Sequence, residues 1–309
     1  PPAGDARPQG RRGDRMRKST LLDASLIAQL DHLELVVRRL FTGRTQGEKR
    51  SKRRGSGSEF ADYRDYSQGD DLRHIDWNVY GRLDRLFLKL FHVEEDLRLS
   101  LFVDTSLSMA HGEPSKLQYA KKLAAALAYV ALANLDRVTI EAANGSSLDR
   151  LPPTRGKQQV WRLLEFVEDL VAQGTTDLAD GLRQFSLRND TPGMKVVISD
   201  FLDKRGYQGA LKWLLKGGNE VVVVQVLSPQ EVKPTIVGDL SLEDCEDGQL
   251  TEVSITAGLL RRYDQNLKSL VGGLRDYCRT RGLAYFFVQS SHPVEEVILN
   301  SMKRTGVVR

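Results

Sequence analysis

From residue 97 onward the chain alternates short apolar segments with longer amphipathic ones, and this alternation restricts the fold more than any other feature. The apolar segments have the length of strands and are rich in valine, isoleucine and leucine. Strands that are apolar on both faces belong in a parallel sheet whose two faces are covered by helices. The alternation therefore predicts an α/β domain with a doubly wound, mostly parallel sheet.

The same pattern locates the individual elements. We expect strands at Leu99–Asp104, Val138–Ala142, Lys195–Ser199, Val221–Leu227 and Leu283–Val288. We expect helices at Lys116–Asn134, Gln158–Ala172, Leu178–Leu187, Gln208–Lys216, Leu259–Arg279 and Pro293–Met302. The alternation breaks between residues 236 and 255, where two short apolar segments flank the turn signal Asp247-Gly248. We interpret this stretch as a hairpin, Leu240–Glu243 with Leu250–Ser254, added to the periphery of the sheet.

The part before residue 97 divides into stretches of different composition. Residues 1–20 carry six basic side chains among prolines and glycines, which predicts a disordered basic tail. Apolar residues from Leu22 to Phe41 recur every three or four positions, which predicts an amphipathic helix. Residues 59–98 mix acids, bases and aromatics with turn signals, which predicts short strands and loops. The predicted regions are thus 1–20, 21–96 with helix, basic linker and strands, and 97–309 with the α/β domain.

The basic linker leaves one alternative function open. Residues 44–54 contain six basic side chains and one acidic one. Such a run could bind nucleic acid or an anionic membrane surface by releasing counterions. No aromatic residue lies among the charges to stack on bases, which favours a solvated loop. A nucleic-acid or membrane-surface adaptor is therefore the alternative interpretation, with nucleic acid disfavoured.

The composition also indicates where in the cell the protein is expected. No apolar run reaches the roughly 20 residues that span a bilayer, and the first residues lack a signal-peptide pattern. The two cysteines, Cys245 and Cys278, are too few for a disulfide scaffold and too isolated for a zinc site. These observations predict a cytoplasmic protein without a transmembrane segment.

Oxygen-bearing side chains follow the ends of two predicted strands. The loop Asp104-Thr105-Ser106-Leu107-Ser108 comes directly after the first strand, where an open α/β sheet binds its ligands. Thr175 and Thr176 open a predicted helix, and Asp200 ends another strand. Carboxylates and hydroxyls are the hard donors that Mg²⁺ and Mn²⁺ prefer. Because the hydroxyls are neutral, a bound ion keeps positive charge, and a carboxylate from a partner protein can fill its open position.

Five of these residues resemble, in order and in context, the metal-dependent adhesion site of von Willebrand factor A domains: Asp104, Ser106, Ser108, Thr176 and Asp200. The resemblance implies an A-type fold and a metal-dependent protein-binding function. It favours Thr176 over Thr175, because the threonine of the family's pattern directly precedes the Asp-Leu pair that starts a helix. The chain departs from the pattern at Phe201, where many A domains have glycine, and Asp200 is expected to support the ion directly or through a metal-bound water.

Short motifs upstream of this site resemble one particular bacterial family. The chain is similar to the bacterial family known as domain of unknown function 58 through Glu59-Phe60, Arg64-x-Tyr66, Gly69-Asp70-Asp71, Arg73-x-Ile75-Asp76-Trp77 and Glu94-Glu95. Leu240–Asp244 also resembles that family, and the resemblance covers roughly residues 20 to 305. Members are commonly encoded beside AAA+ ATPases of the MoxR type. The resemblance therefore implies a MoxR-type ATPase or its client as the protein partner, in complex assembly or remodelling.

An enzymatic interpretation competes with this one. Aspartyl-phosphate phosphatases also place an Asp beside Mg²⁺ at the end of a first strand, but they need a second acid and a lysine near the phosphate. Here the second acidic position is Ser106, and Lys195 lies at the wrong end of its strand. The chain also lacks a P-loop motif for nucleotide phosphates. We therefore predict a binding protein with no catalytic residues and no small-molecule substrate, and a Mg²⁺-dependent phosphatase only as a less favoured alternative.

A second cluster joins acids to aromatics, at Asp70-Asp71 and His74–Trp77. Acids beside aromatic rings can pair with arginine anchors of a partner protein. Such side chains can equally form an internal network that ties this region to the α/β domain. We favour the internal network.

Overall fold

The computed structural model describes residues 21–36, 59–68, 70–92, 97–144, 147–175, 177–236, 238–245 and 248–309. The predictions made for the tail at 1–20 and for the basic run at 44–54 lie outside these residues, and so does the predicted ligand Thr176.

The centre of the molecule is a six-stranded sheet in the order β10-β7-β6-β3-β4-β5. Its strands are β3 (Arg98–Asp104), β4 (Arg137–Asn144), β5 (Ser147–Arg155), β6 (Met194–Ser199), β7 (Glu220–Leu227) and β10 (Ala284–Gln289). All pairings are parallel except that of β5, which pairs antiparallel with β4. The five predicted strands are confirmed. The edge strand β5 was not predicted, and only such an edge position accommodates its Pro152 and Pro153.

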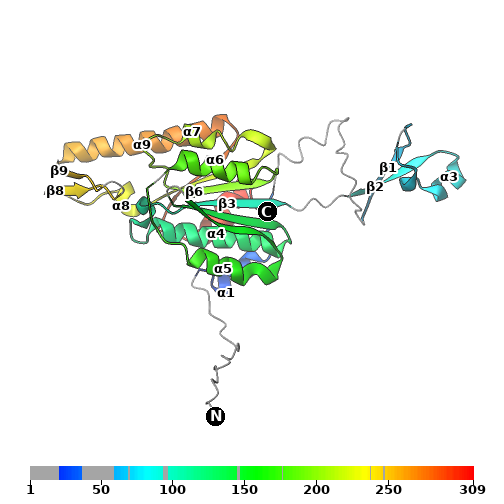
Figure 1. The fold of residues 1–309 in the computed structure, drawn as a ribbon, viewed down its shortest axis with the longest axis horizontal. Helices are drawn as coiled ribbons and strands as arrows, with labels where there is room; N and C mark the ends of the chain where they lie inside the picture. The colour runs from blue at the N-terminus through cyan, green and yellow to red at the C-terminus, as the bar shows by residue number, and fades with distance from the viewer. Residues whose placement is uncertain are drawn as a thin grey trace, which may run out of the picture.

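Helices cover both faces of this sheet (Figure 1). One face packs against α1, α4 and α5, and the other against α6, α7 and α9. The helices of this domain are α1 (Ala24–Leu30), α4 (Lys116–Ala133), α5 (Val160–Glu168), α6 (Leu178–Arg188), α7 (Gln208–Leu211), α8 (Pro229–Val232), α9 (Ala257–Thr280), α10 (Val294–Glu296) and α11 (Lys303–Thr305). Helices on both faces of a mostly parallel sheet confirm the predicted doubly wound, mostly parallel α/β class. Among the described helices, none has the length and apolar character needed to cross a bilayer.

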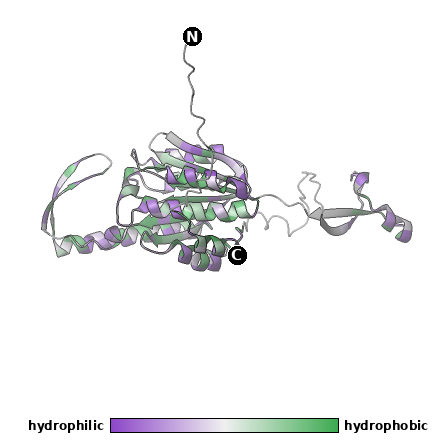
Figure 2. Ribbon diagram, turned by 90° about the horizontal axis from the view of Figure 1, so that it is seen from below, coloured by the Kyte–Doolittle hydropathy of each residue, from purple (hydrophilic) through white to green (hydrophobic). Residues whose placement is uncertain are grey.

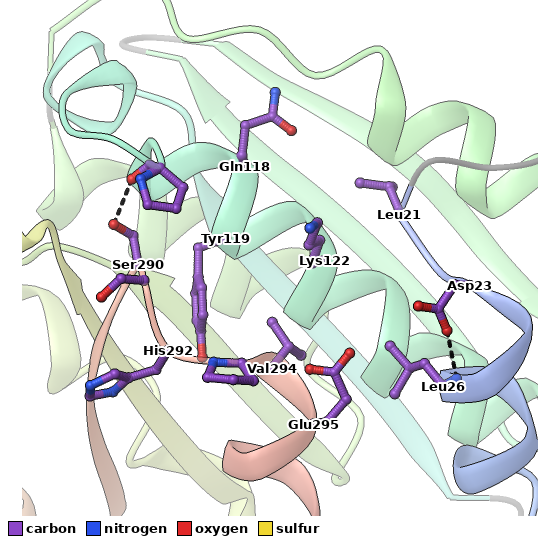
Figure 3. Close-up of a pocket in the computed structure, with 13 residues that line it drawn as sticks. Leu21, Asp23, Leu26, Gln118, Tyr119, Lys122, Ser290, His292, Val294 and Glu295 are labelled. Carbon is purple, nitrogen blue, oxygen red and sulfur yellow. Dashed lines mark hydrogen bonds between the residues drawn. The ribbon is translucent and has the colours of Figure 1, made fainter.

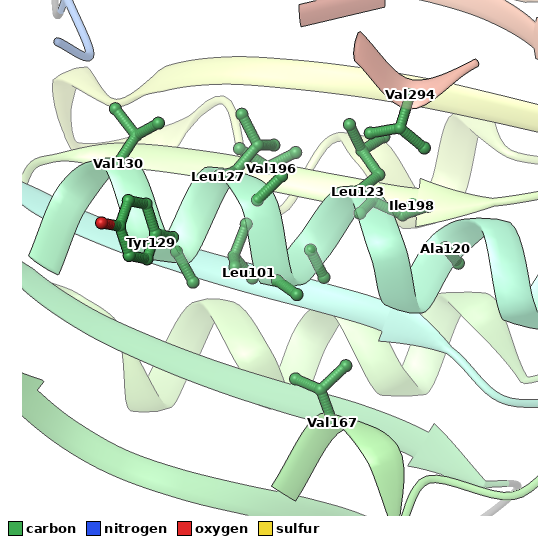
Figure 4. Packing of buried hydrophobic residues seen from close by; sticks show 14 of the residues in the cluster. Leu101, Ala120, Leu123, Leu127, Tyr129, Val130, Val167, Val196, Ile198 and Val294 are labelled. Atoms are coloured by element: carbon green, nitrogen blue, oxygen red, sulfur yellow. The ribbon is translucent and has the colours of Figure 1, made fainter. Parts of the chain in front are cut away.

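Helix α4 organises the larger of the two cores and is buried along most of its length. Its Leu123 and Leu127 belong to one apolar cluster with Leu101 of β3 and with Val196 and Ile198 of β6 (Figure 4). A helix that is apolar on nearly all sides is one that other elements surround. This packing fixes β3 and β6 beside each other, and the candidate site lies at their carboxyl ends.

The N-terminal helix is shorter than its apolar spacing predicts. The prediction of a helix over Leu22–Phe41 is wrong for residues 31–36, because α1 ends at Leu30, and its remaining part, residues 37–41, lies outside the described residues. Leu33 and Leu35 are buried outside any helix, and Leu35 forms an antiparallel bridge with Val308 near the C-terminus. Pairing with the C-terminal segment therefore outweighs helical spacing here.

Residues 59–92 form a small unit with a sheet of its own. Strands β1 (Glu59–Asp65) and β2 (Phe87–His92) pair antiparallel, and the short helix α3 (Trp77–Leu83) lies between them in sequence. The strands agree with the prediction, whereas α3 was not expected. Asp76 caps α3 and accepts a hydrogen bond from the Tyr63 hydroxyl at 2.9 Å, and both of these contacts lie within this unit. The domain boundary at residue 97 stays a prediction.

The predicted hairpin is present as β8 (Gly238–Glu243) and β9 (Leu250–Ile255), but it forms a separate two-stranded sheet. Its placement on the periphery of the main sheet was wrong. The chain leaves β7 at the carboxyl end and continues through α8, so the hairpin begins beyond the end of the sheet and not beside an edge strand (Figure 1).

Candidate metal centre

Asp104 is the last residue of β3 and is only 3% exposed. Its carboxylate oxygens accept hydrogen bonds from the Ser106 backbone N–H at 3.0 Å and from the Ser199 hydroxyl at 2.6 Å. Burial raises the pKa of Asp104 to about 6, and the negative charge of Asp200 acts in the same direction. The carboxylate is thus held in one orientation at the carboxyl end of its strand.

The loop after Asp104 is anchored from both sides. The Thr105 hydroxyl donates to the Ala143 carbonyl of β4 at 2.6 Å, and the Gln173 N–H donates to the Thr105 carbonyl at 2.8 Å. These bonds leave the two serine hydroxyls side by side, with Ser106 Oγ 3.1 Å from Ser108 Oγ. Ser106 is buried, whereas Ser108 is half-buried.

Asp200 follows β6, the strand that pairs in parallel with β3. The Ser108 hydroxyl donates to Asp200 Oδ2 at 2.7 Å, and the Leu202 N–H donates to Asp200 Oδ1 at 3.0 Å. Neighbouring parallel strands bring their carboxyl ends to the same edge of a sheet, which explains the meeting of residues that lie far apart in sequence. The structure thus brings together the predicted Asp104, Ser106, Ser108 and Asp200.

Phe201, the departure from the adhesion-site pattern, has φ of +58°. Glycine adopts this left-handed region freely, whereas another residue is strained there by about 1 kcal/mol or more. The Phe201 side chain is 1% exposed and packs in the second apolar core. Burial of its ring offsets the strain, so the chain keeps a glycine-like backbone conformation after Asp200.

The third predicted loop is described only in part. Thr176 lies outside the described residues, and its neighbour Thr175 is exposed. Asp177 caps α6 through the Asp180 N–H at 2.9 Å and also accepts a hydrogen bond from Arg205 at 3.0 Å. The Leu107 N–H donates to the Gly174 carbonyl at 3.1 Å, which holds this loop beside the serine loop.

Lys116 adds a charge that the sequence interpretation missed. It begins α4 and is fully buried, and its Nζ lies 2.7 Å from Asp200 Oδ2 and also bonds the Glu231 carboxylate of α8. Burial acts to lower the pKa of Lys116, but the charges of Asp200 and Glu231 outweigh it, and the pKa is raised. A lysine in the first turn of a helix opposes the helix dipole, and this is the signal that could have identified it.

Lys116 is a second buried lysine that bears on the phosphatase alternative. Lys195 is 2% exposed and lies near the start of β6, at the opposite end from Ser199. Lys116 lies at the correct end, but it is buried and bonded to two carboxylates. Its ammonium group is therefore already engaged by the Asp200 and Glu231 carboxylates.

The donor set fits a hard divalent cation. Within the described ranges, no three His, Cys, Asp or Glu side chains are grouped so that they could hold a metal. A metal here would therefore depend on the hydroxyls of Ser106 and Ser108 together with carboxylate oxygen, which suits Mg²⁺ or Mn²⁺ and not Zn²⁺. Lys116 already bonds Asp200 Oδ2, so an ion would share that carboxylate with an ammonium group.

A pocket elsewhere on the molecule is separate from this centre. It lies between α1, α4 and the start of α10, and Asp23, Tyr119, Lys122 and Glu295 are among its lining residues (Figure 3). Burial and the charge of Glu295 raise the pKa of Tyr119. None of the predicted metal ligands lines this pocket. This pocket is thus distinct from the candidate metal centre, whose Asp104, Ser106 and Asp200 lie buried at the carboxyl ends of β3 and β6.

The fold and the centre together define an α/β protein that gathers oxygen donors at the carboxyl edge of a parallel sheet. The chain matches the family described as Protein of unknown function DUF58 over residues 62–269, and it belongs to that family. An uncharacterized protein of Mycobacterium tuberculosis is 32% identical over 257 residues, which cover 79% of this chain and 78% of the relative.

Two solved structures show a more distant likeness. Conserved hypothetical protein BatB from Bacteroides thetaiotaomicron aligns with 67% of this chain and 98% of its own, at 18% identity and a TM-score of 0.43. The SpRpn10 VWA domain aligns with 67% of this chain and 95% of its own, at 12% identity and a TM-score of 0.36. A likeness at this level assigns neither a site nor an activity.

Proposed function

We propose that this protein is a metal-dependent protein-interaction module with a von Willebrand factor A-like domain. The observation that carries the proposal is the meeting of the Ser106 and Ser108 hydroxyls with Asp200, beside Asp104, at the ends of β3 and β6. Neutral hydroxyls leave a bound Mg²⁺ or Mn²⁺ with net positive charge. The ion would thereby supply a Lewis-acidic attachment point for a carboxylate of the partner.

Each residue has a defined part in this proposal. Asp104, Ser106, Ser108 and Thr176 hold the ion, and Asp200 supports it. Asp104 also shapes the loop, because its carboxylate accepts the Ser106 N–H. An Asp or Glu of the partner completes the metal shell. The proposal includes no catalytic residue, and the burial of Lys116 between two carboxylates is its main support against phosphoryl transfer.

The proposed partner is a MoxR-type AAA+ ATPase or a client of that ATPase. The support for it is membership of the DUF58 family together with the genomic association that the family resemblance implies. In such a system the ATPase supplies the energy of nucleotide hydrolysis, and this protein recognises a carboxylate-bearing surface. Complex assembly or remodelling is the corresponding proposed role.

The test is binding to the purified MoxR-type ATPase of the source organism. We expect binding in Mg²⁺ that EDTA abolishes and that Asp104→Ala abolishes as well. Asp264→Ala is the matched control, because it removes an exposed carboxylate on α9 that pairs with Lys268. Binding that survives EDTA but falls steeply with salt would instead favour the basic 44–54 adaptor. Asp104-dependent turnover of a chromogenic phosphate ester would favour the enzyme.

A further inference from the structure

The hairpin of β8 and β9, called here the hairpin arm (residues 238–245 and 248–255), extends beyond the carboxyl end of the sheet (Figure 1). Every residue of β8 is exposed, and so is every residue of β9 except Val253 and Ile255, which are half-buried. An isolated two-stranded hairpin is at best marginally stable in water unless its apolar face is covered. The two strands of the hairpin arm therefore supply little packing of their own.

The register of the hairpin arm separates two different faces. Leu240 lies opposite Val253, and Gly238 lies opposite Ile255. Directly opposite residues of an antiparallel pair share a face, and positions two apart along a strand share it too. Leu240, Leu242, Val253 and Ile255 therefore form one apolar face, on which Leu240 is 37% and Leu242 is 42% exposed.

The other face and the turn carry the charge. Asp239, Glu243 and Glu252 lie on the face opposite Leu240 and Leu242. Leu250 lies on this acidic face as well. Residues 238–255 contain six acidic side chains and no basic one, which gives this segment a charge of −6 in a chain whose net charge is +4. Figure 2 shows hydrophilic and hydrophobic residues in alternation along the hairpin arm. An exposed apolar face on an arm whose reverse face and turn are acidic is complementary to an apolar surface flanked by bases that reach around the arm.

We propose that the hairpin arm docks a protein partner that presents apolar side chains flanked by lysine or arginine. The chain itself contains an instance of the charge pairing, because Lys204 bonds Asp244 at 2.8 Å. A second copy of this chain using the same acidic arm would bring two segments of −6 together, which disfavours a symmetric arm-to-arm contact. This docking goes beyond the proposed metal-dependent contact and does not require the metal.

The hairpin arm is connected to the metal centre through α8 and α9. The Tyr263 hydroxyl of α9 donates to the Glu231 carbonyl at 2.8 Å, and the Glu231 carboxylate bonds Lys116, which in turn bonds Asp200. A partner on the hairpin arm would therefore lie at the same end of the molecule as the Asp104 loop. The two contacts suit one partner surface that carries both an acidic residue and a basic, apolar strip.

The experiment uses the full chain and a labelled amphipathic peptide of leucine and lysine, followed by fluorescence anisotropy. We expect this peptide to bind and a matched peptide of leucine and glutamate not to bind, although the chain as a whole is basic. Leu242→Ser, on the apolar face, should weaken binding about tenfold, which corresponds to the loss of one apolar contact residue. Leu250→Ser is the matched control, because Leu250 is 70% exposed but lies on the acidic face, and it should change binding by less than about twofold.

Three results would overturn the proposal. The first is equal weakening by the two leucine substitutions, and the second is equal binding of the acidic peptide. The third is a dimer of the wild-type chain in sedimentation that Leu242→Ser converts to monomer, because a second copy would then cover the face. EDTA should leave peptide binding unchanged, and Leu242→Ser should bind Mg²⁺ as the wild type does. Failure of this docking is thus distinguishable from failure of the metal centre.

Discussion

The candidate metal centre and the hairpin arm lie at the same end of the domain but are built in opposite ways. At the metal centre, polar groups are buried and bonded to one another, as Asp200 is to Ser108 and Lys116. On the hairpin arm, apolar groups such as Leu242 are exposed in a two-stranded sheet. The core beneath β3 and β6 fixes the first region, whereas the second has no comparable support. Substitutions in the two regions should therefore differ sharply in their effect on stability.

Lys116→Ala should cause the largest loss of stability. This change leaves the buried Asp200 and the largely buried Glu231 without their shared cation, which should lower the free energy of unfolding by about 3–5 kcal/mol. Urea denaturation followed by circular dichroism measures it. Lys268→Ala is the control, because that lysine is exposed in its pair with Asp264 and should matter little. Similar losses from both variants would contradict the role given to Lys116.

Two leucine substitutions compare how much a side chain stabilises the fold in the core and on the hairpin arm. Leu123 of α4 is fully buried, so Leu123→Ala should lower the free energy of unfolding by about 2–5 kcal/mol. Leu242→Ala should change it by less than about 0.5 kcal/mol, because that side chain already contacts water. The same denaturation experiment compares them. A loss of several kcal/mol at Leu242 would mean that the apolar face of the arm is covered within the chain.

A loss of stability smaller than those of Lys116→Ala and Leu123→Ala is expected at Gly112, which follows the Asp104–Ser108 loop in sequence and lies against Ser228. Gly112 has φ of +96°, and a Cβ there would lie 2.3 Å from Ser228 Cβ, just before α8. Gly112→Ala should therefore lower the melting temperature, with a cost of about 1–3 kcal/mol. Gly209→Ala is the control, because a Cβ in that helical position meets nothing within 4 Å and should be neutral or stabilising. An unchanged melting temperature for Gly112→Ala would show that the contact with Ser228 relaxes freely.

Much of the fold could be predicted from the sequence because the buried strands are short, continuous apolar runs. The predicted strand Val221–Leu227 differs by one residue from the observed Glu220–Leu227. The failures lie where distant segments decide the local structure. Leu35 pairs with Val308, and no spacing within residues 22–41 contains that information. The hairpin was recognised from its turn, but its separation from the sheet depends on the direction in which α8 carries the chain.

The candidate site likewise contains residues that the sequence could place and residues that it could not. Asp104 and Asp200 could be placed together because Asp104 ends one strand and Asp200 follows another, and the carboxyl ends of these two parallel strands share an edge of the sheet. Lys116 could not be placed by this rule, because it reaches Asp200 from the first turn of a helix. Lys116 also bonds Glu231 of α8, which lies more than 100 residues away in sequence. Charge partners that come from helices depend on packing, which the strand pattern does not predict.

Calorimetric titration of the wild-type chain with Mg²⁺ and with Mn²⁺ is the most direct test of the metal centre. We expect one binding site in the wild type, no binding in Asp104→Ala, and wild-type binding in Leu242→Ser on the hairpin arm. Circular dichroism of Asp104→Ala should show that the fold remains. Binding that persists in a folded Asp104→Ala variant, or no binding by the wild type, would contradict a metal centre at the carboxyl ends of β3 and β6.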